Sequence, residues 1–366
     1  MVKVESWRLL DLGALQPLEA QTLYEAVATA LDKGSVPSTV ILCHPAKPYV
    51  CLGFHQEIEK EIDIGFCQRY NLPIIRRSQG GGATYLDSGQ QFYQIIADED
   101  SAIVPYAVND FFEKFLRPTV YAYRRLGVPA RYKPINDVVV NGRKISGNGA
   151  GKIGKAAILV GNIILDLDYD SMTQVLKVPS EKFRGKLAKS IRQWVTSLRR
   201  ELGYIPQRSQ VKKLLIEGYG KIGVNLVPGE LTDEERRIFA EEVKPKHLSK
   251  EWLYMPELRH PALVRKRTIK VAGDVKVVVA CHKAKKMIRV TIEIVSSKIR
   301  NILISGDFFM VPETALPKLE RELVNVVLNH DDILSSVKRF YESFQVQTPG
   351  IEPEDIAQAI MSAVEE

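Results

Sequence analysis

Three consecutive glycines beside a pair of arginines form the first segment whose residue types could perform chemistry. Gly80–Gly82 follow Arg76-Arg77 after a gap of two residues, and β-prone stretches lie on both sides. Glycines in a strand weaken a sheet, but their backbone N–H groups can form a concave site for an anion. Arginines add a fixed positive charge suited to phosphate or carboxylate. A β-bulge with surface arginines is the alternative, and the arginine pair favours the anion site.

The second segment is a hairpin that carries a lysine. Residues 136–147 contain Asn141-Gly142 between two β-prone stretches, which is a strong signal for a hairpin turn. Strict alternation would place Lys144 and Ser146 on one face of the return strand. Lys144 could bind a phosphate, polarise a carbonyl, or simply face solvent. Asp137 could form the turn or contact a ligand or metal.

A third segment is strongly basic. Residues 182–200 contain seven basic residues and no acidic residue. Such a stretch is either a solvated helix face or a docking surface for an acidic partner, where charge raises the association rate more than the affinity.

Two nucleotide-binding patterns around residue 150 do not fit their surroundings. Gly149–Gly154 match GxGxxG, and Lys155 extends the match almost to a Walker A loop. Both motifs require a helix to begin there, because the N-terminus of the helix donates N–H groups to the phosphates. Residues 156–168 instead have the pattern of a buried strand, and Ala156 has no hydroxyl for Mg²⁺. We therefore interpret the segment as a flexible glycine-rich loop.

The elements that must position these segments form two groups. Strands and helices are mixed without regular βαβ alternation up to about residue 205, which indicates an α+β domain. The expected helices are 17–34, 57–71 and 104–126, and the expected strands are 38–44, 48–55, 72–77, 83–97 and 156–168.

A second domain is expected after a proline-containing loop. Helices are predicted at 210–222 and 231–244, and the loop follows at 245–261. Three strands at hairpin spacing and three helices then form a separate, smaller α+β unit. The strands are expected at 268–282, 286–297 and 298–309, and the helices at 315–328, 331–343 and 353–365.

Composition and charge limit the classes of partner. The net charge of the 366 residues is +7, but residues 251–366 carry 16 basic and 16 acidic residues, so the excess lies in the first part. That excess favours an acidic or phosphorylated ligand. No nucleic-acid-binding motif is present, and no apolar run approaches the ~20 residues of a membrane span. Four cysteines without a CxxC pair and a start unlike a signal peptide favour the cytoplasm.

The segments, in this order and at these distances, resemble the lipoate–protein ligase family. RRSQGGGATYLDSGQ (76–90) is similar to the family pattern RRxSGGGxVxHDxGN, and NDVVVNGRKISG (136–147) is similar to its Gly-[Arg/Lys]-Lys-[Ile/Val]-Ser-Gly hairpin. LVGNIILDLDY (159–169) and KFRGKLAKSIRQWVTSL (182–198) resemble its next two motifs. KHLSKEWLY (246–254) resembles the end of its catalytic domain, and IRNILISGDFF (299–309) resembles a strand of its accessory domain.

This resemblance implies the fold and the reaction. It implies a mixed-sheet catalytic domain like that of biotin and lipoate ligases over 1–255, and a smaller α+β accessory domain over 262–366. The implied enzyme uses ATP, with Mg²⁺, to convert lipoate to lipoyl-AMP. It then transfers the lipoyl group to a lysine of lipoyl domains in 2-oxoacid dehydrogenase subunits and in the glycine-cleavage carrier protein.

The resemblance also assigns roles to residues. Lys144 would be catalytic and would contact both the acyl carbonyl and the α-phosphate, and Asp137 would lie near the metal. The implied ATP-binding residues are Arg77, Gly82, Ala83, Thr84, Tyr85, Asp137 and Lys144. The implied lipoate-binding residues are Arg76, Gly80, Gly81, Lys144, Ser146 and Gly147, with Leu52, Phe54 and Ile164 as an apolar slot.

Several positions depart from the family pattern and leave alternatives open. Gln79, Leu86 and Gln90 replace the usual Ser or Thr, His and Asn, and Leu159-Val160 replace a histidine pair. A non-catalytic binder of lipoyl proteins is therefore one alternative. An octanoyltransferase of the same fold is another, but such enzymes use a cysteine nucleophile after the lysine. No cysteine lies between Cys67 and Cys281. The GRGRxG loop of biotin ligases is absent.

Overall fold

A computed structural model describes residues 4–259 and 275–365, which form two compact units. Unit 1 comprises the described residues up to Cys51, together with Ile62–Arg77 and Thr84–Leu248. Unit 2 comprises Leu52–Glu61, Ser78–Ala83 and the described residues from Ser249 onward. The chain therefore passes between the units several times. The division into domains 1–255 and 262–366 stays a prediction.

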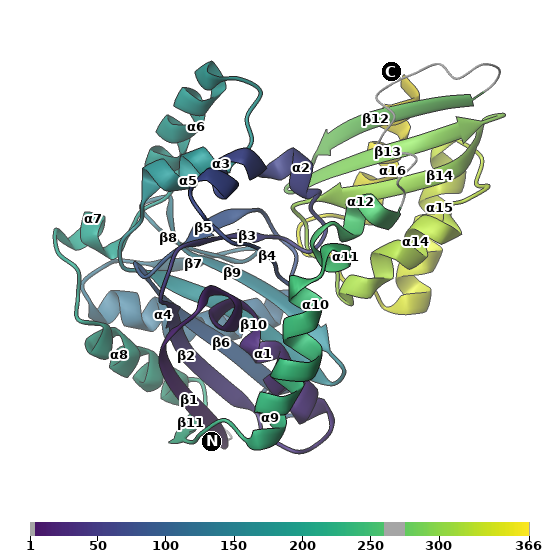
Figure 1. Ribbon diagram of the computed structural model, residues 1–366. Coiled ribbons are helices and arrows are strands. Elements are labelled where there is room, and N and C mark those ends of the chain that lie inside the picture. The colour runs from purple at the N-terminus through teal and green to yellow at the C-terminus, as the bar shows by residue number, and fades with distance from the viewer. Residues whose placement is uncertain (1–3, 260–274, 366) are drawn as a thin grey trace. The chain divides into compact units, whose positions relative to one another are not determined.

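Unit 1 is built on an eight-stranded mixed sheet with the order β11-β1-β2-β6-β10-β9-β8-β7 (Figure 1). β1 pairs in parallel with both β2 and β11, and every other pairing is antiparallel. The strands are β1 (Glu5–Leu15), β2 (Thr39–Pro45), β6 (Gln90–Asp98), β7 (Arg131–Lys133), β8 (Asp137–Val140), β9 (Arg143–Ile153), β10 (Ala156–Ile164) and β11 (Val224–Pro228).

Helices cover both faces of this sheet. α1 (Pro17–Asp32) begins with proline in its first turn and a capping box between Gln16 and Glu19, and most of its residues are buried. α4 (Val108–Arg125) lies on the other face, where the Phe115 ring stacks on Trp7 of β1 with centroids 5.6 Å apart. The remaining helices of unit 1 are α3 (Ile64–Arg69), α5 (Tyr169–Val175), α6 (Glu181–Trp194), α7 (Leu198–Leu202), α8 (Arg208–Lys221), α9 (Asp233–Ile238), η1 (Phe239–Val243) and α10 (Lys244–Leu248).

A small sheet with the order β4-β3-β5 carries the arginine segment. Its strands are β3 (Tyr49–Leu52), β4 (Ile74–Arg76) and β5 (Thr84–Leu86). β3 and β5 are antiparallel, with Val50 opposite Tyr85 and Cys51 opposite Thr84. The glycine cluster lies in the connection from β4 to β5.

Unit 2 has a three-stranded antiparallel sheet, β12-β13-β14, packed against helices (Figure 1). Its core combines the aliphatic residues of β13 and β14 with those of the last three helices. The elements are α2 (Ile58–Glu61), α11 (Lys250–Leu253), α12 (Met255–Arg259), β12 (Val275–Lys283), β13 (Met287–Val295), β14 (Lys298–Gly306), η2 (Glu313–Ala315), α14 (Leu316–Glu322), α15 (His330–Phe344) and α16 (Pro353–Glu365).

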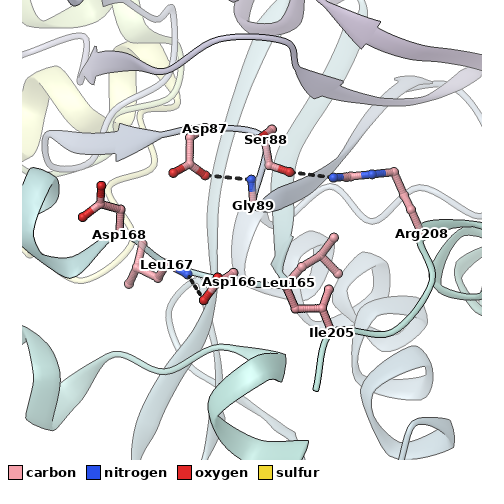
Figure 2. A pocket seen from close by; sticks show the side chains of 9 residues that line it. All are labelled: Asp87, Ser88, Gly89, Leu165, Asp166, Leu167, Asp168, Ile205 and Arg208. Carbon is pink, nitrogen blue, oxygen red and sulfur yellow. Dashed lines mark hydrogen bonds between the residues drawn. The ribbon is translucent and has the colours of Figure 1, made fainter. Parts of the chain in front are cut away.

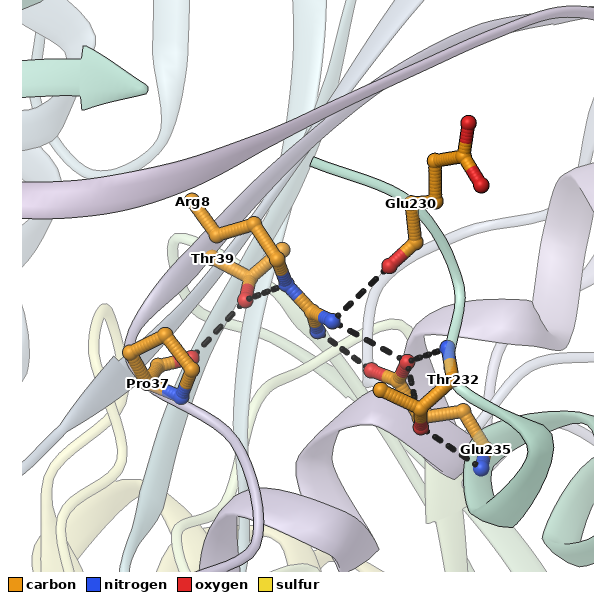
Figure 3. Close-up of polar contacts among 6 residues, drawn as sticks. All are labelled: Arg8, Pro37, Thr39, Glu230, Thr232 and Glu235. Atoms are coloured by element: carbon orange, nitrogen blue, oxygen red, sulfur yellow. Dashed lines mark hydrogen bonds and ion pairs between the residues drawn. The ribbon is translucent and has the colours of Figure 1, made fainter. Parts of the chain in front are cut away.

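A buried ion pair ties the first strand of unit 1 to α9 (Figure 3). The Arg8 guanidinium contacts both carboxylate oxygens of Glu235, and it also donates to Thr39 Oγ1 at 3.1 Å and to the Glu230 carbonyl at 3.2 Å. The Arg8 side chain is 11% exposed and the Glu235 side chain 0%. Glu235 also accepts the Thr232 N–H at 2.7 Å in the capping box of α9. Both charges are thus enclosed and well supplied with partners.

The α+β class is confirmed, and so are several local expectations. β8 and β9 form the expected hairpin, whose turn residues Asn141 and Gly142 have φ of 48° and 81°. No helix starts at the GxGxxG pattern, because residues 149–153 lie within β9 and lead into β10. The flexible glycine-rich loop expected there is wrong, since these residues pair with β10 as part of a regular strand.

Other expectations are wrong at specific places. The strand expected at 83–97 is two strands of different sheets, because Asp87–Gly89 form a turn between β5 and β6. The helix expected at 57–71 is divided into α2 and α3. The loop expected at 245–261 is wrong up to residue 259, where the chain forms the short helices α10, α11 and α12. The strands β1 and β11 were not expected. Residues 268–274 of the strand expected at 268–282 lie outside the described residues. Within 4–259 and 275–365, no helix is long and apolar enough to cross a bilayer.

Candidate functional site

Lys144 is fixed by its backbone and left open at its charged end. It lies near the start of β9, opposite Val139, and its carbonyl accepts the Thr196 N–H at 2.8 Å from the segment after α6. Its ammonium lies 2.7 Å from Asp137 Oδ1. The side chains of the lysine and the aspartate are 38% and 29% exposed. A cation with one carboxylate partner and access to solvent remains available to an anionic ligand.

The lysine side chain extends over a glycine. A Cβ added to Gly147 would lie 3.4 Å from Lys144 Cε, an ordinary van der Waals distance, so the lysine side chain passes directly beside this residue. The Gly147 N–H donates to Asn162 Oδ1 at 2.9 Å, and the Asn162 amide donates to Gln90 Oε1 at 2.9 Å. Lys144, Gly147, Asn162 and Gln90 therefore bring polar groups from β9, β10 and β6 to one end of the sheet.

Ser146 lies on the other face of β9, and this corrects the expected alternation. Its hydroxyl is buried, 3.3 Å from the Tyr93 hydroxyl, which in turn donates to Asn148 Oδ1 at 2.5 Å. The prediction that Lys144 and Ser146 share a face is wrong because the register between β8 and β9 shifts at Val138/Val139. Such a bulge adds a residue and disrupts the alternation of faces.

Arg77 and Thr84 flank the same residue of the small sheet. Arg76 is fully buried and Arg77 is 9% exposed. The Arg77 guanidinium donates to Cys51 Sγ at 3.3 Å, and Thr84 lies opposite Cys51 across the β3–β5 pairing. The structure thus brings Arg77 close to Thr84 and its neighbour Tyr85, although the glycine cluster separates them in sequence.

The glycine cluster itself belongs to unit 2, with Ala83. A Cβ added to Gly80 would lie 2.3 Å from the Phe308 carbonyl oxygen, so only glycine fits there. Gly81 has φ of 96°, and its N–H donates to the same carbonyl at 3.2 Å. Gly82 has wider space, with its nearest neighbour, the Asp307 Cβ, at 3.9 Å. Packing within unit 2 therefore accounts for Gly80 and Gly81.

The residues expected to form an apolar slot are divided between the units. Leu52 and Phe54 are buried in unit 2, where the Phe54 ring contacts Trp252 with centroids 5.5 Å apart. Ile164 is buried at the end of β10 in unit 1. The structure of each unit alone does not bring these three side chains together.

A pocket of about 380 Å³ opens in unit 1 between the β5–β6 turn and the segment after β10 (Figure 2). Arg208 fixes this turn, because its guanidinium donates to the Ser88 carbonyl at 2.6 Å and to the Gln90 carbonyl at 2.8 Å. The lining residues are Asp87, Ser88, Gly89, Leu165, Asp166, Leu167, Asp168, Ile205 and Arg208.

The pocket is acidic and lies at the same end of the sheet as Lys144. Leu165 donates its N–H to the Gly89 carbonyl at 2.9 Å, directly after the β10–β6 ladder that ends at Ile164 and Gln90. Burial and then the nearby charges of Asp168 and Asp166 raise the pKa of Asp87. Sequence reasoning missed this pocket, although the DSG and DLD triplets at 87–89 and 166–168 were a possible signal.

The cysteines of unit 1 are poorly suited to act as nucleophiles. Cys43, Cys51 and Cys67 are buried. Burial, with a contribution from Asp11, raises the pKa of Cys43 to about 12, and burial next to Asp63 raises that of Cys67 to about 11. Burial also raises the pKa of Cys51, although Arg77 opposes the rise. The exposed Cys281 lies on β12 in unit 2.

The side chains of residues 4–259 and 275–365 do not form a metal site of their own. Among the described residues, no group of three or more His, Cys, Asp or Glu side chains has the arrangement to hold a metal ion. Asp137, the expected metal contact, directs Oδ1 to the Lys144 ammonium. A divalent ion that enters with a nucleotide would depend on phosphate oxygens for most of its ligands.

Comparisons with known proteins show the family of this chain. Residues 16–220 match the model of the lipoyl protein ligase A/B catalytic domain. An octanoyltransferase LipM from Kyrpidia tusciae is 29% identical over 69% of this chain and 99% of its own. Lipoate–protein ligase 1 from Staphylococcus aureus is 27% identical over 80% of this chain and 83% of its own.

Solved structures show the same fold. The bipartite lipoate protein ligase of Thermoplasma acidophilum superimposes with a TM-score of 0.60 at 24% identity, covering 73% of this chain and 99% of its own. LipL1 of Plasmodium falciparum, solved with lipoate, superimposes with a TM-score of 0.67 at 14% identity, covering 99% of this chain and 100% of its own. With more than half of its length matched by the family model, the chain belongs to the lipoyl protein ligase A/B catalytic domain family of lipoate ligases and octanoyltransferases.

Proposed function

We propose that this protein is an ATP-dependent lipoate–protein ligase. In the first step the lipoate carboxylate attacks the α-phosphorus of ATP, which forms lipoyl-AMP and releases pyrophosphate. In the second step a lysine amine of a lipoyl domain attacks the acyl carbonyl, which forms an amide and releases AMP and a proton. The observation that carries the proposal is an accessible lysine in a unit that offers no accessible thiol.

The presence or absence of an accessible thiol distinguishes the two reactions of the family, which are acyl transfer through a thioester and activation by ATP. Acyl transfer through a thioester requires a thiolate that the acyl donor can reach. Cys43, Cys51 and Cys67 are buried with raised pKa values, and no cysteine follows Lys144 until Cys281. Without a thiol to hold the acyl group, a phosphoanhydride is a suitable source of activation.

The length of the matches supports the same choice. The K. tusciae octanoyltransferase aligns over 99% of its own length but only 69% of this chain, so it has almost no length left to match the remainder. The S. aureus ligase aligns over 80% of this chain. Residues beyond the octanoyltransferase-like part are therefore shared, in part, with a lipoate ligase.

Lys144 is suited to act in both steps. The α-phosphate gains negative charge as the adenylate forms, and the acyl oxygen gains it as the amine attacks. The backbone of Lys144 is held by Val139 on one side and by Thr196 on the other. Its ammonium can therefore stabilise each of these charges without rearrangement of the strand. Arg77, buried on the small sheet, offers a planar donor for a phosphate. We assign the glycine cluster and Thr84-Tyr85 to the same nucleotide.

We propose that Mg²⁺ is bound as MgATP and that the acceptor is a lipoyl domain. This domain would belong to a 2-oxoacid dehydrogenase subunit or to the glycine-cleavage carrier protein. The T. acidophilum ligase was studied together with its E2 lipoyl domain, which makes the corresponding domain a suitable first substrate. Octanoyl transfer is the second candidate, favoured by the identity to octanoyltransferases.

One experiment separates these candidates. A recombinant lipoyl domain is incubated with the protein, Mg²⁺ and free lipoate, with or without ATP, and its intact mass is measured. The proposal predicts a lipoyl mass increase that requires ATP and is lost in Lys144→Ala. No increase with the free acid, but ATP-independent transfer from an octanoylated carrier, would establish the second candidate instead.

A further inference from the structure

His247 connects the strand of the arginines to a buried carboxylate. It lies in α10, and its side chain is 0% exposed. Its Nδ1 is 2.9 Å from the Arg76 carbonyl oxygen, and its Nε2 is 2.8 Å from Glu25 Oε1 on α1. The imidazole thus bridges α1 and β4, which are about 50 residues apart in the sequence.

The carbonyl that His247 contacts is at the open edge of the small sheet. β4 is an outer strand in the order β4-β3-β5. The Pro73 carbonyl accepts the Val50 N–H of β3 at 2.8 Å, so alternation turns the Arg76 carbonyl, three residues later, away from β3. An edge carbonyl has no ladder partner and needs a donor when it is buried. His247 supplies one where the strand leads into Arg77.

The geometry also defines the donor in the contact between His247 and β4. A carbonyl oxygen only accepts hydrogen bonds, so Nδ1 must carry a proton. Burial alone would raise the pKa of Glu25, but the hydrogen bond and charge of His247 and the charge of Lys246 together lower it to about 2. The contact of Nε2 with this carboxylate anchors the other side of the ring to α1. Lys246 Nζ, at 2.7 Å, and the Tyr24 hydroxyl, at 3.1 Å, also donate to Glu25.

We propose that His247, held in place by Glu25, is a positioning residue that fixes β4 and thereby places Arg77 for the nucleotide. The catalytic part of this inference rests on the proposed ligase function. His247 acts through the Arg76 carbonyl and needs no contact with ATP. Catalysis should therefore be impaired in variants that lose the hydrogen-bond donor to the Arg76 carbonyl, and preserved in variants that keep this donor without the imidazole ring.

Two variants of similar size separate the two nitrogens. The amide nitrogen of asparagine lies where Nδ1 of histidine lies, and that of glutamine lies where Nε2 lies. His247→Asn keeps a donor for the Arg76 carbonyl and loses the contact with Glu25, whereas His247→Gln does the reverse. Glu235→Gln is the matched control, because it weakens another buried ion pair of unit 1 that contacts no residue of β4.

The first readout is the KM for ATP in lipoyl-AMP formation. We expect His247→Gln to raise this KM about tenfold, as expected for one lost hydrogen bond, with kcat changed less. His247→Asn and Glu235→Gln should stay within about threefold of the wild type. Equal values for the asparagine and glutamine variants would overturn the inference, because general destabilisation would then explain both.

The second readout does not depend on the reaction. Amide hydrogen exchange of the peptide that contains residues 72–78 should become faster in His247→Gln but not in His247→Asn. Equal exchange in the two variants overturns the inference. A wild-type protein that forms no lipoyl-AMP contradicts the proposed function, and the exchange comparison then still decides whether His247 fixes β4.

Discussion

Two ion pairs of the same eight-stranded sheet differ in how far their charges are enclosed. Arg8 and Glu235 join β1 to α9, and their side chains are 11% and 0% exposed. Lys144 and Asp137 join β9 to β8, and their side chains are 38% and 29% exposed. Arg8 also donates to Thr39 and to the Glu230 carbonyl. The enclosed pair has several further hydrogen bonds and stabilises the fold, whereas the partly exposed pair leaves the Lys144 cation available to a ligand.

The sharpest test of this comparison removes the open cation. Lys144→Ala should lower the rate of lipoyl-AMP formation about 10³-fold, because a preorganised charge at the phosphate is lost. The melting temperature should change little, since the pair is partly solvated. Single-turnover measurement of lipoyl-AMP provides the rate.

A lysine of the same strand is the matched control. Lys152 of β9 is 36% exposed and lies 2.5 Å from Glu99. Lys152→Ala removes a comparable open pair away from Asn162 and Gly147, and it should leave the rate within about twofold. Similar losses in both variants would mean that an open pair of this sheet is not by itself a sign of function.

The enclosed pair should show the opposite behaviour. Glu235→Gln leaves the Arg8 guanidinium buried without its carboxylate, which should lower the free energy of unfolding by about 3 kcal/mol. Urea denaturation measures this loss, and Glu241→Gln, at an exposed position of η1, should change stability by less than about 0.5 kcal/mol. At a temperature where the variant is folded, its lipoyl-AMP formation should equal that of the wild type. A fall in activity without a fall in stability would break the distinction.

Removing the partner of the open cation should have an intermediate effect. Asp137→Asn takes the carboxylate away from Lys144 Nζ but leaves an amide oxygen of similar reach. We expect lipoyl-AMP formation to fall about tenfold, because the lysine is held less firmly. A loss as large as that of Lys144→Ala would show instead that Asp137 contacts the nucleotide or its metal directly.

The sequence predicted those features that depend on neighbouring residues. The hairpin that carries Lys144 follows from Asn141-Gly142, whose positive φ values match the turn that joins twisted strands. The rejection of the GxGxxG pattern was correct for a similar reason, because the β-rich run after Lys155 forms β10.

Features that depend on distant contacts could not be predicted. The bulge that separates Lys144 from Ser146 arises in the pairing with β8 and has no local signal. The need for glycine at Gly80 comes from the Phe308 carbonyl, more than 200 residues away. The pocket combines the turn at 87–89 with residues 165–168 and Arg208, which come together only through the sheet order and the contacts of α8.

The smallest expected effect concerns the exposed basic residues of α6, which extend the comparison of enclosed and exposed charges from one ion pair to a surface. This helix buries only Ile191, and it exposes Lys186, Lys189 and the Trp194 ring, which is 56% exposed. The segment after it pairs with Lys144, so an acceptor that reaches Lys144 passes close to this surface.

We predict that α6 attracts an acidic acceptor domain. The rate of lipoyl transfer should fall several-fold between low and physiological salt, while lipoyl-AMP formation changes less. In Lys186→Glu/Lys189→Glu the transfer rate at low salt should fall to the high-salt value of the wild type. A flat salt profile for transfer would mean that these cations, although open, do not contribute to docking.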